Sequence, residues 1–245
     1  MKSYASFCPV AKTAEIFAER WTPLLLRELC MGARRFGELQ QGLPLISRSL
    51  LAQRLRELEL AGVVERMPLP DGVRHEYRLT VEGEAFRPLI DLMGMWGQTH
   101  GRGRIRPGDT DPAQLVWGMR RHLETAALPA GRLVVQFEFS GVTKAWNAAR
   151  YWWLVLRRPE VDVCQKHPGY DVDVTIAARL HAFTLVWLGH RGLAEARRAG
   201  EVRLDGPPPK VALAREALGL RDEPWVRGFD FSPRPDPFGP PVPPA

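Results

Sequence analysis

Apolar residues recur at helical spacing through residues 1–100. Leu51, Leu55 and Leu58 are separated by four and three positions, so they share one face of a predicted helix. Ser47 is placed to cap the start of this helix, and Gly62 is placed to end it. Three shorter helices are predicted before it, over residues 11–17, from Thr22-Pro23 onward with Thr22 as the N-cap, and over residues 36–42.

The pattern changes to strands after this helix. Residues 63–67 form a short apolar run, and residues 73–79 alternate between apolar or aromatic and charged side chains across a Pro-Asp-Gly turn signal. Thr80 then caps a predicted long helix that extends to Trp96. Three helices followed by a hairpin are the element order of a winged helix. The apolar face of the last helix could be core or a dimer seam, and its position after the wing favours the seam.

Polar and cationic side chains occupy the other face of the fourth helix. Hydroxyl, amide and guanidinium groups at such positions can contact base edges and phosphates, although the same residues also suit an ordinary solvated face. The hairpin tip is expected to reach a phosphate or the minor groove. The candidate DNA contacts are Ser47, Arg48, Ser49, Gln53, Arg56, Arg74 and His75.

Charge agrees with a polyanionic partner without requiring one. Lys and Arg outnumber Asp and Glu by 34 to 28 in 245 residues, which gives a net charge of +6. Only five of the basic residues are Lys, which fits either phosphate and guanine recognition or a GC-rich coding genome. The chain begins without a signal-peptide pattern and has no apolar run long enough to cross a bilayer. These features predict a cytoplasmic protein that does not associate with membranes.

Few residues suggest catalysis, a cofactor or a metal. The chain has an odd number of cysteines, Cys8, Cys30 and Cys164, which argues against a secreted disulfide scaffold. Cys164 and His167 offer only two nearby ligands, and no second pair completes a zinc site. No nucleophile–base pattern or glycine-rich phosphate loop is present. The sequence therefore predicts a protein that is not an enzyme and holds neither a cofactor nor a metal.

The rest of the chain predicts an α+β domain between two segments rich in glycine or proline. Residues 101–112 are predicted to be a linker, residues 113–220 the second domain, and residues 221–245 a proline-rich tail. Strands are expected over residues 132–139, 149–156, 161–164, 171–176 and 201–204, and helices over 112–128, 178–188, 193–199 and 210–218.

A family resemblance adds to this interpretation of the first domain. The residues that carry it include Cys8-Pro9, Trp21, Arg35-Phe36, Ile46-Ser47, Arg54-Leu55, Gly62-Val63-Val64, Tyr77-Arg78-Leu79-Thr80 and Gly83. In this order they resemble the HxlR-type winged helix-turn-helix regulators of bacteria, although Glu19-Arg20 stands where many relatives have Gly-Lys. The resemblance implies a homodimer that binds a near-palindromic operator with one recognition helix per half-site. It also makes Cys8 a candidate redox sensor, the alternative being a small apolar residue packed near the dimer helix.

A weaker resemblance concerns the second domain. Val135 to Phe139, Tyr151 to Leu154, His167 to Val174 and Thr184 to Gly189 resemble the sterol carrier protein type 2 domain. This resemblance implies a pocket for a small apolar ligand, with Trp146, Trp153, Phe183 and Trp187 as candidate lining residues, although these aromatics would equally fill a core. We therefore expect a ligand-responsive repressor. The alternatives are a thiol-switched regulator acting through Cys8, or a lipid carrier that uses its winged helix for protein association.

Overall fold

The chain forms two compact units. The computed structural model describes residues 3–70, 74–123, 128, 131–142, 150–158 and 160–225. The division between the units falls after Met95, so that the N-terminal unit ends there and the C-terminal unit begins at Trp96. Within this described part of the chain, no helix has both the length and the apolar character needed to cross a bilayer.

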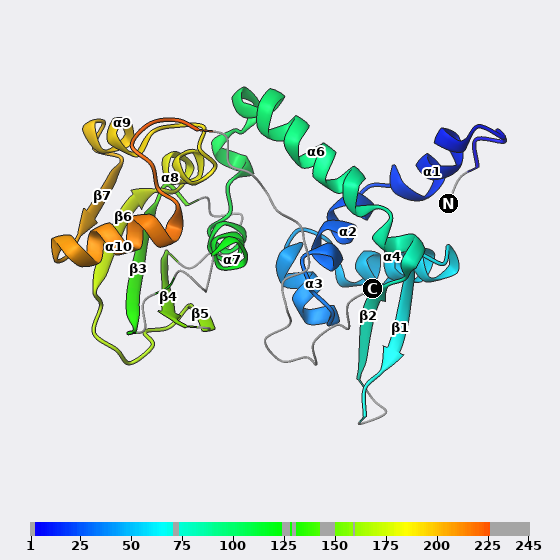
Figure 1. Cartoon of the computed structure of the whole chain (residues 1–245), viewed down its shortest axis with the longest axis horizontal. Coiled ribbons are helices and arrows are strands. Elements are labelled where there is room, and N and C mark those ends of the chain that lie inside the picture. Colours follow the sequence, from blue (N-terminus) through cyan, green and yellow to red (C-terminus); the bar gives the residue numbers. More distant parts are fainter. Residues whose placement is uncertain are drawn as a thin grey trace. The chain divides into compact units, whose positions relative to one another are not determined.

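The N-terminal unit has the element order of a winged helix, as predicted (Figure 1). The helical core precedes a two-stranded antiparallel hairpin, and two further helices follow the hairpin. The elements are α1 (Pro9–Phe17), α2 (Thr22–Cys30), α3 (Phe36–Gly42), α4 (Arg48–Leu60), β1 (Val64–Pro68), β2 (His75–Leu79), α5 (Val81–Glu84) and α6 (Arg87–His100).

Leucines from three helices form the core of this unit. Leu25 of α2, Leu39 of α3 and Leu51 of α4 are fully buried, and Leu55 and Leu58 continue the buried face of α4. Burial of a leucine side chain contributes about 1.5–3 kcal/mol to folding. This contribution fixes the rotation of α4 about its axis, so its polar face is directed to solvent.

Two predicted details of the N-terminal unit are wrong. Thr22 is the first residue of α2 and not its N-cap, because Trp21 turns the chain in the left-handed conformation at φ 78°. The long helix expected after Thr80 is divided into α5 and α6. Pro88 explains the division, because a proline inside a helix lacks an N–H donor and clashes with the preceding turn but fits in a first turn. Thr80 does cap α5, since its Oγ1 accepts a hydrogen bond from Gly83 N at 3.1 Å.

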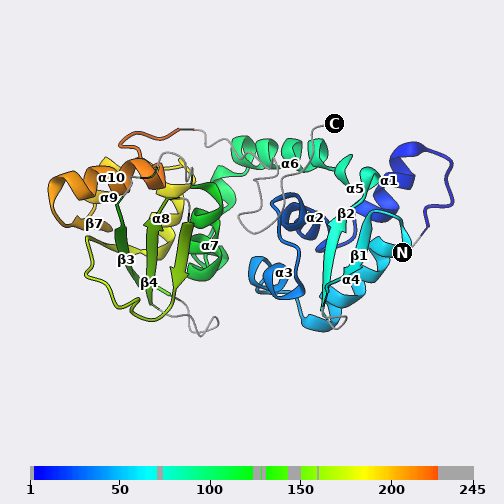
Figure 2. The ribbon, with the colours of Figure 1, turned by 60° about the horizontal axis from the view of Figure 1, so that its bottom comes forward.

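The C-terminal unit contains a five-stranded sheet with the strand order β5-β4-β3-β6-β7. β3 and β6 are parallel, and the other neighbouring strands are antiparallel. The elements are α7 (Pro112–His122), β3 (Leu133–Ser140), β4 (Tyr151–Arg157), β5 (Glu160–Cys164), β6 (Val174–Arg179), α8 (Leu180–Trp187), α9 (Leu193–Arg198), β7 (Val202–Asp205) and α10 (Pro208–Leu218) (Figure 2).

One face of this sheet carries the main core. Phe137, Phe139 and Trp152 belong to the same buried cluster as Phe183 of α8 and Met119 of α7. Residues of α9 and α10 complete this cluster. Because successive strand residues point to opposite faces, α7, α8, α9 and α10 pack on the face to which Phe137 and Phe139 belong.

The segment expected as a linker is ordered within the C-terminal unit. Residues 101–112 contain two short 3-10 helices, Arg102–Arg104 and Pro107–Asp109, and Thr110 and Asp111 are buried. Asp111 caps α7, because its Oδ1 accepts a hydrogen bond from Gln114 N at 2.7 Å. Burial raises the pKa of the Asp111 carboxyl group. Glycine and proline therefore mark tight turns in this segment instead of a free connection.

Candidate nucleic-acid interface

The start of α4 is fixed by a side-chain cap. Ser47 Oγ accepts a hydrogen bond from Leu50 N at 3.2 Å and lies 3.1 Å from Ser49 Oγ. The helix therefore begins at Arg48, as the sequence predicts. This cap determines which side chains project from the first turn of the helix.

The two faces of α4 separate as expected. The leucines of the buried face lie in the core, whereas the predicted contact residues of α4 are exposed. The exposed set is Ser47, Arg48, Ser49, Gln53 and Arg56. The structure thus presents hydroxyl, amide and guanidinium groups together on the outer face of one helix.

Local contacts hold two of these side chains weakly. The Arg48 guanidinium lies over the Phe36 ring at 5.3 Å from its centroid, and Gln53 Nε2 donates to Glu57 Oε1 at 2.9 Å. An exposed cation–π contact contributes about 0.5–1 kcal/mol. This contact is weak enough for the Arg48 guanidinium to exchange it for a contact with a phosphate. Arg56 forms no hydrogen bond or ion pair with any other described residue. These side chains therefore contribute little to the stability of the fold and are available to contact a ligand.

Arg54 differs from its neighbours on the same helix. Its Nη2 lies 3.0 Å from Glu19 Oε2, its Nη1 lies 2.5 Å from Glu57 Oε2, and its side chain is only 13% exposed. Glu19 precedes α2, so the contact with Glu19 attaches α4 to another part of the N-terminal unit, whereas Glu57 belongs to α4 itself. Arg54 therefore has a structural role and does not belong to the exposed set.

The wing adds a cation that the sequence interpretation missed. Arg66 of β1 pairs in register with Tyr77 of β2, and Arg66 Nη2 lies 3.2 Å from His75 Nδ1. Arg74 is exposed just before β2, and its carbonyl oxygen accepts a hydrogen bond from Leu69 N at 2.8 Å. The alternation of β1 does not indicate Arg66, because Arg66 lies two residues after the buried Val64, on the same strand face, and is nevertheless exposed.

The cysteines of this unit have contrasting environments. Cys8 is exposed at the N-cap position of α1, where its backbone N donates to Ser6 Oγ at 3.2 Å. Cys30 is buried at the end of α2, and this burial raises the pKa of its thiol to about 11. Cys8 is accordingly the thiol of this unit that reagents in solution can reach.

The predicted ligand-lining aromatics that the structure describes lie in two separate clusters. Phe183 and Trp187 of α8 lie in the main core. Trp153 belongs to a separate cluster with Val134 and Val155, on the other face of the sheet. Its neighbour Trp152 takes the core position, because adjacent strand residues point in opposite directions. Trp146, the fourth candidate, lies outside the described residues.

A model of the HxlR-like helix-turn-helix family matches residues 16–104. The HTH-type transcriptional regulator YvaP of Bacillus subtilis is 39% identical over 94 residues, which cover 38% of this chain and 87% of that protein. The regulator YodB of the same organism is 36% identical over 107 residues, or 43% of this chain and 92% of YodB. The chain therefore belongs to the HxlR-like helix-turn-helix family of transcriptional regulators.

Among solved structures, the redox regulator HypR in its reduced form shares 30% sequence identity with this chain. That match covers 38% of this chain and 94% of HypR, with a TM-score of 0.37. The reduced form of YodB from B. subtilis gives a TM-score of 0.35 at 35% identity, over 39% of this chain and 95% of YodB.

Proposed function

We propose that the N-terminal unit binds operator DNA, with α4 in the major groove and the β1–β2 wing against the backbone. The observation that carries this proposal is the outer face of α4, where Arg48, Gln53 and Arg56 are exposed above a leucine core. Arginine pairs with guanine and glutamine with adenine in the major groove. Arg66 and Arg74 of the wing supply cations suited to phosphate contact.

The operator complex is proposed to contain two copies of the chain. Apolar side chains of the N-terminal unit remain exposed on α6 and near α1, with Phe7 99% exposed. The others include Val10, Leu92, Met93 and Met95. Exposed apolar surface of this kind marks an interaction site. A second copy supplies the same surface, and the resulting two-fold symmetry matches a near-palindromic operator.

The C-terminal unit is proposed to act as a sensor domain related to sterol carrier proteins. A sheet with α7, α8, α9 and α10 packed on one face supports this relation, since it provides a continuous apolar layer. Ligand binding changes DNA affinity only if the ligand binds one arrangement of the two DNA-binding helices better than the other. Release of a repressor by its ligand is the expected direction, because a dimer on its operator blocks polymerase without further contacts.

A thiol switch at Cys8 is the second candidate for control of DNA binding. The exposure of Cys8 at a helix start favours it, whereas Cys30 is buried and held as a thiol. In this case Cys8→Ser abolishes the response to an oxidant while the affinity for DNA is unchanged. A ligand-controlled regulator instead keeps its response after this substitution.

The test of DNA binding uses the full chain and the DNA upstream of its own gene. We expect sequence-specific binding that weakens steeply with salt. Arg48→Ala or Arg56→Ala is expected to weaken specific binding by about 5- to 100-fold, as the loss of one base or phosphate contact does. Arg157→Ala, at an exposed arginine of the C-terminal unit, is the matched control. Full affinity and specificity in both α4 variants would refute the assignment of this helix.

A further inference from the structure

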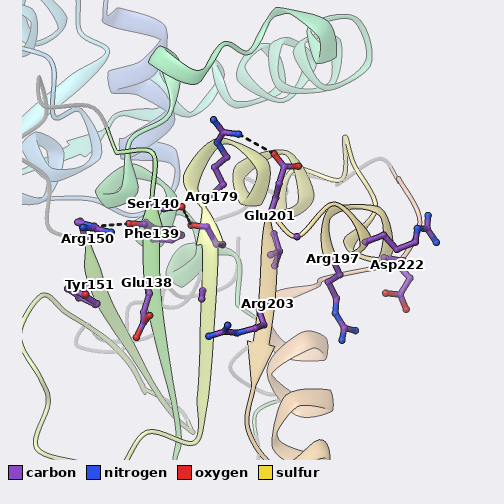
Figure 3. A pocket seen from close by; sticks show the side chains of 16 residues that line it. Glu138, Phe139, Ser140, Arg150, Tyr151, Arg179, Arg197, Glu201, Arg203 and Asp222 are labelled. Atoms are coloured by element: carbon purple, nitrogen blue, oxygen red, sulfur yellow. Dashed lines mark hydrogen bonds and ion pairs between the residues drawn. The ribbon is translucent and has the colours of Figure 1, made fainter.

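The C-terminal unit contains a pocket that is separate from its apolar core. The pocket has a volume of about 1110 Å³ and lies where β3 and β6 end and β4 and β7 begin, with α9 at one side (Figure 3). Ligand sites of known proteins commonly occupy about 300–1,000 Å³. The space therefore suffices for an organic molecule of considerable size.

Arginine is the most frequent residue in the lining of this pocket. Five guanidinium groups come from three different elements, β6, α9 and β7, and from the residue before β4. They belong to Arg150, Arg179, Arg197, Arg198 and Arg203. Three carboxylates also line the pocket, so the formal charge of the lining is 5 − 3 = +2.

These carboxylates interact with partners outside the pocket. Glu201 contacts Arg191 closely, while the pocket residue Arg179 lies at 3.7 Å from it. Asp222 Oδ2 lies 2.7 Å from Arg215 Nη2, and Glu138 accepts a hydrogen bond from Gln136. Neither Arg191, Arg215 nor Gln136 lines the pocket. One lining arginine also has a partner outside the pocket, because Arg203 Nε lies 2.6 Å from Asp205 Oδ2. The acidic groups therefore compensate the pocket arginines only in part.

Several of the arginines are correspondingly available to a ligand. Arg197 and Arg198 are exposed and form no ion pair with another described residue. Arg150 donates to the carbonyl oxygen of Phe139 at 3.3 Å and forms no ion pair with another described residue. Guanidinium groups bind carboxylate, phosphate and sulfonate oxygens through paired N–H donors, and the interaction is stronger than a neutral hydrogen bond.

Apolar groups line the same pocket. Phe139, Ala178 and Val202 are buried behind it, and Tyr151, which is 47% exposed, lies at its side on β4. In Figure 3 the Tyr151 ring and Arg150 lie together at one end, while Arg197 and Asp222 lie at the other. A ligand that spans the pocket thus meets both guanidinium groups and apolar surface.

We infer that this pocket binds an organic anion that carries two or more negative charges on an apolar or aromatic body. The negative charge of the ligand is inferred from the formal charge of +2 of the pocket lining. Its apolar or aromatic body is inferred from the apolar surface beside the arginines. This inference goes beyond the proposed binding of operator DNA and does not depend on it. It also places the ligand at the arginine-lined strand ends and not between the sheet and its helices.

The test compares two fluorescent probes of the same shape with the full chain. The probes are 8-anilinonaphthalene-1-sulfonate, which carries a negative charge, and the uncharged N-phenyl-1-naphthylamine. We expect the sulfonate to bind about tenfold more tightly or better, and an aromatic disulfonate to bind more tightly still. The double variant Arg197→Gln/Arg203→Gln is expected to weaken sulfonate binding by about tenfold and to leave the neutral probe unaffected.

The control and a second variant keep the outcomes distinct. Arg157→Gln removes an exposed arginine at the opposite end of β4 and should not change either probe's affinity. If circular dichroism shows that the double variant is unfolded, sulfonate binding is measured with Arg197→Gln alone, because Arg197 is exposed and forms no ion pair with another described residue. Equal affinity of the original protein for the two probes overturns the inference. A loss of sulfonate affinity in Arg157→Gln as large as that in the double variant overturns it as well. Displacement of the sulfonate by random-sequence duplex DNA also overturns it, because the arginines would then contact a nucleic acid.

Discussion

The two cysteines of the N-terminal unit show how position alone determines the chemistry of a thiol. Cys8 is exposed beside the start of α1, whereas Cys30 is fully buried in α2. Only a thiolate reacts with electrophiles or oxidants at an appreciable rate. With a pKa of about 11, Cys30 at pH 8 is about one part thiolate in a thousand.

We therefore expect selective labelling of the folded protein by iodoacetamide at pH 8. Cys8 should react first, while Cys30 should remain unmodified until the chain is unfolded in urea, and mass spectrometry of the peptides measures both. Cys164 is half-buried, and burial raises its pKa, so its rate should fall between the two. Labelling of Cys30 at the rate of Cys8 would contradict its placement in the core.

At the scale of elements, α4 is held by contacts that its sequence only partly indicates. The leucine spacing and Ser47 predict its core face and its first residue, because both depend on neighbours within the helix. The attachment through Arg54 to Glu19 could not be predicted, because it joins residues 35 positions apart. Pro88 could have predicted the division between α5 and α6, since the proline is visible in the sequence.

Arg54 and Arg56 form a matched pair for testing the role of each face. Arg54→Ala should lower the free energy of unfolding by about 1–3 kcal/mol, because it removes two ion-paired hydrogen bonds at a largely buried site. Arg56→Ala should change it by less than about 0.5 kcal/mol, as is usual for an exposed residue. Urea unfolding at pH 7.5 measures both values. A larger loss for Arg56→Ala than for Arg54→Ala would reverse the two assignments.

At the scale of the whole molecule, the two units differ in how far the sequence predicts them. The winged helix consists of consecutive elements, so local patterns largely suffice. The C-terminal sheet joins β3 to β6 in parallel across a long intervening segment, and the arginine-lined pocket gathers residues between positions 138 and 222. The sequence located the strands and helices of this unit, but it did not show which face of each strand packs against the helices. The adjacent tryptophans of β4 are an example, because they lie on opposite faces of the sheet.

Long-range contacts also predict how the stability of the C-terminal unit depends on pH. His190 Nε2 lies 2.8 Å from Gln98 Oε1, and Gln98 Nε2 donates to the carbonyl oxygen of Leu188. Burial, together with the charge of Arg102, lowers the pKa of His190 from its ordinary value of 6.5. The folded unit therefore binds fewer protons at this site than the unfolded chain does at pH values just below 6.5. Stability from this group is fully present above pH 6.5 and decreases as the pH falls toward the lowered pKa.

His190→Gln tests this dependence, because glutamine preserves a hydrogen-bond donor near Gln98 but does not titrate. The urea midpoint of the full chain, followed by tryptophan fluorescence, should fall less between pH 7.5 and pH 5.5 in the variant than in the original protein. His167→Gln is the matched control, since it removes an exposed histidine and leaves the contact between His190 and Gln98 in place. An identical fall in His190→Gln and in the original protein would show that protonation of His190 does not control the stability of this unit. A smaller fall in His190→Gln alone would assign the acid sensitivity to the contact between His190 and Gln98.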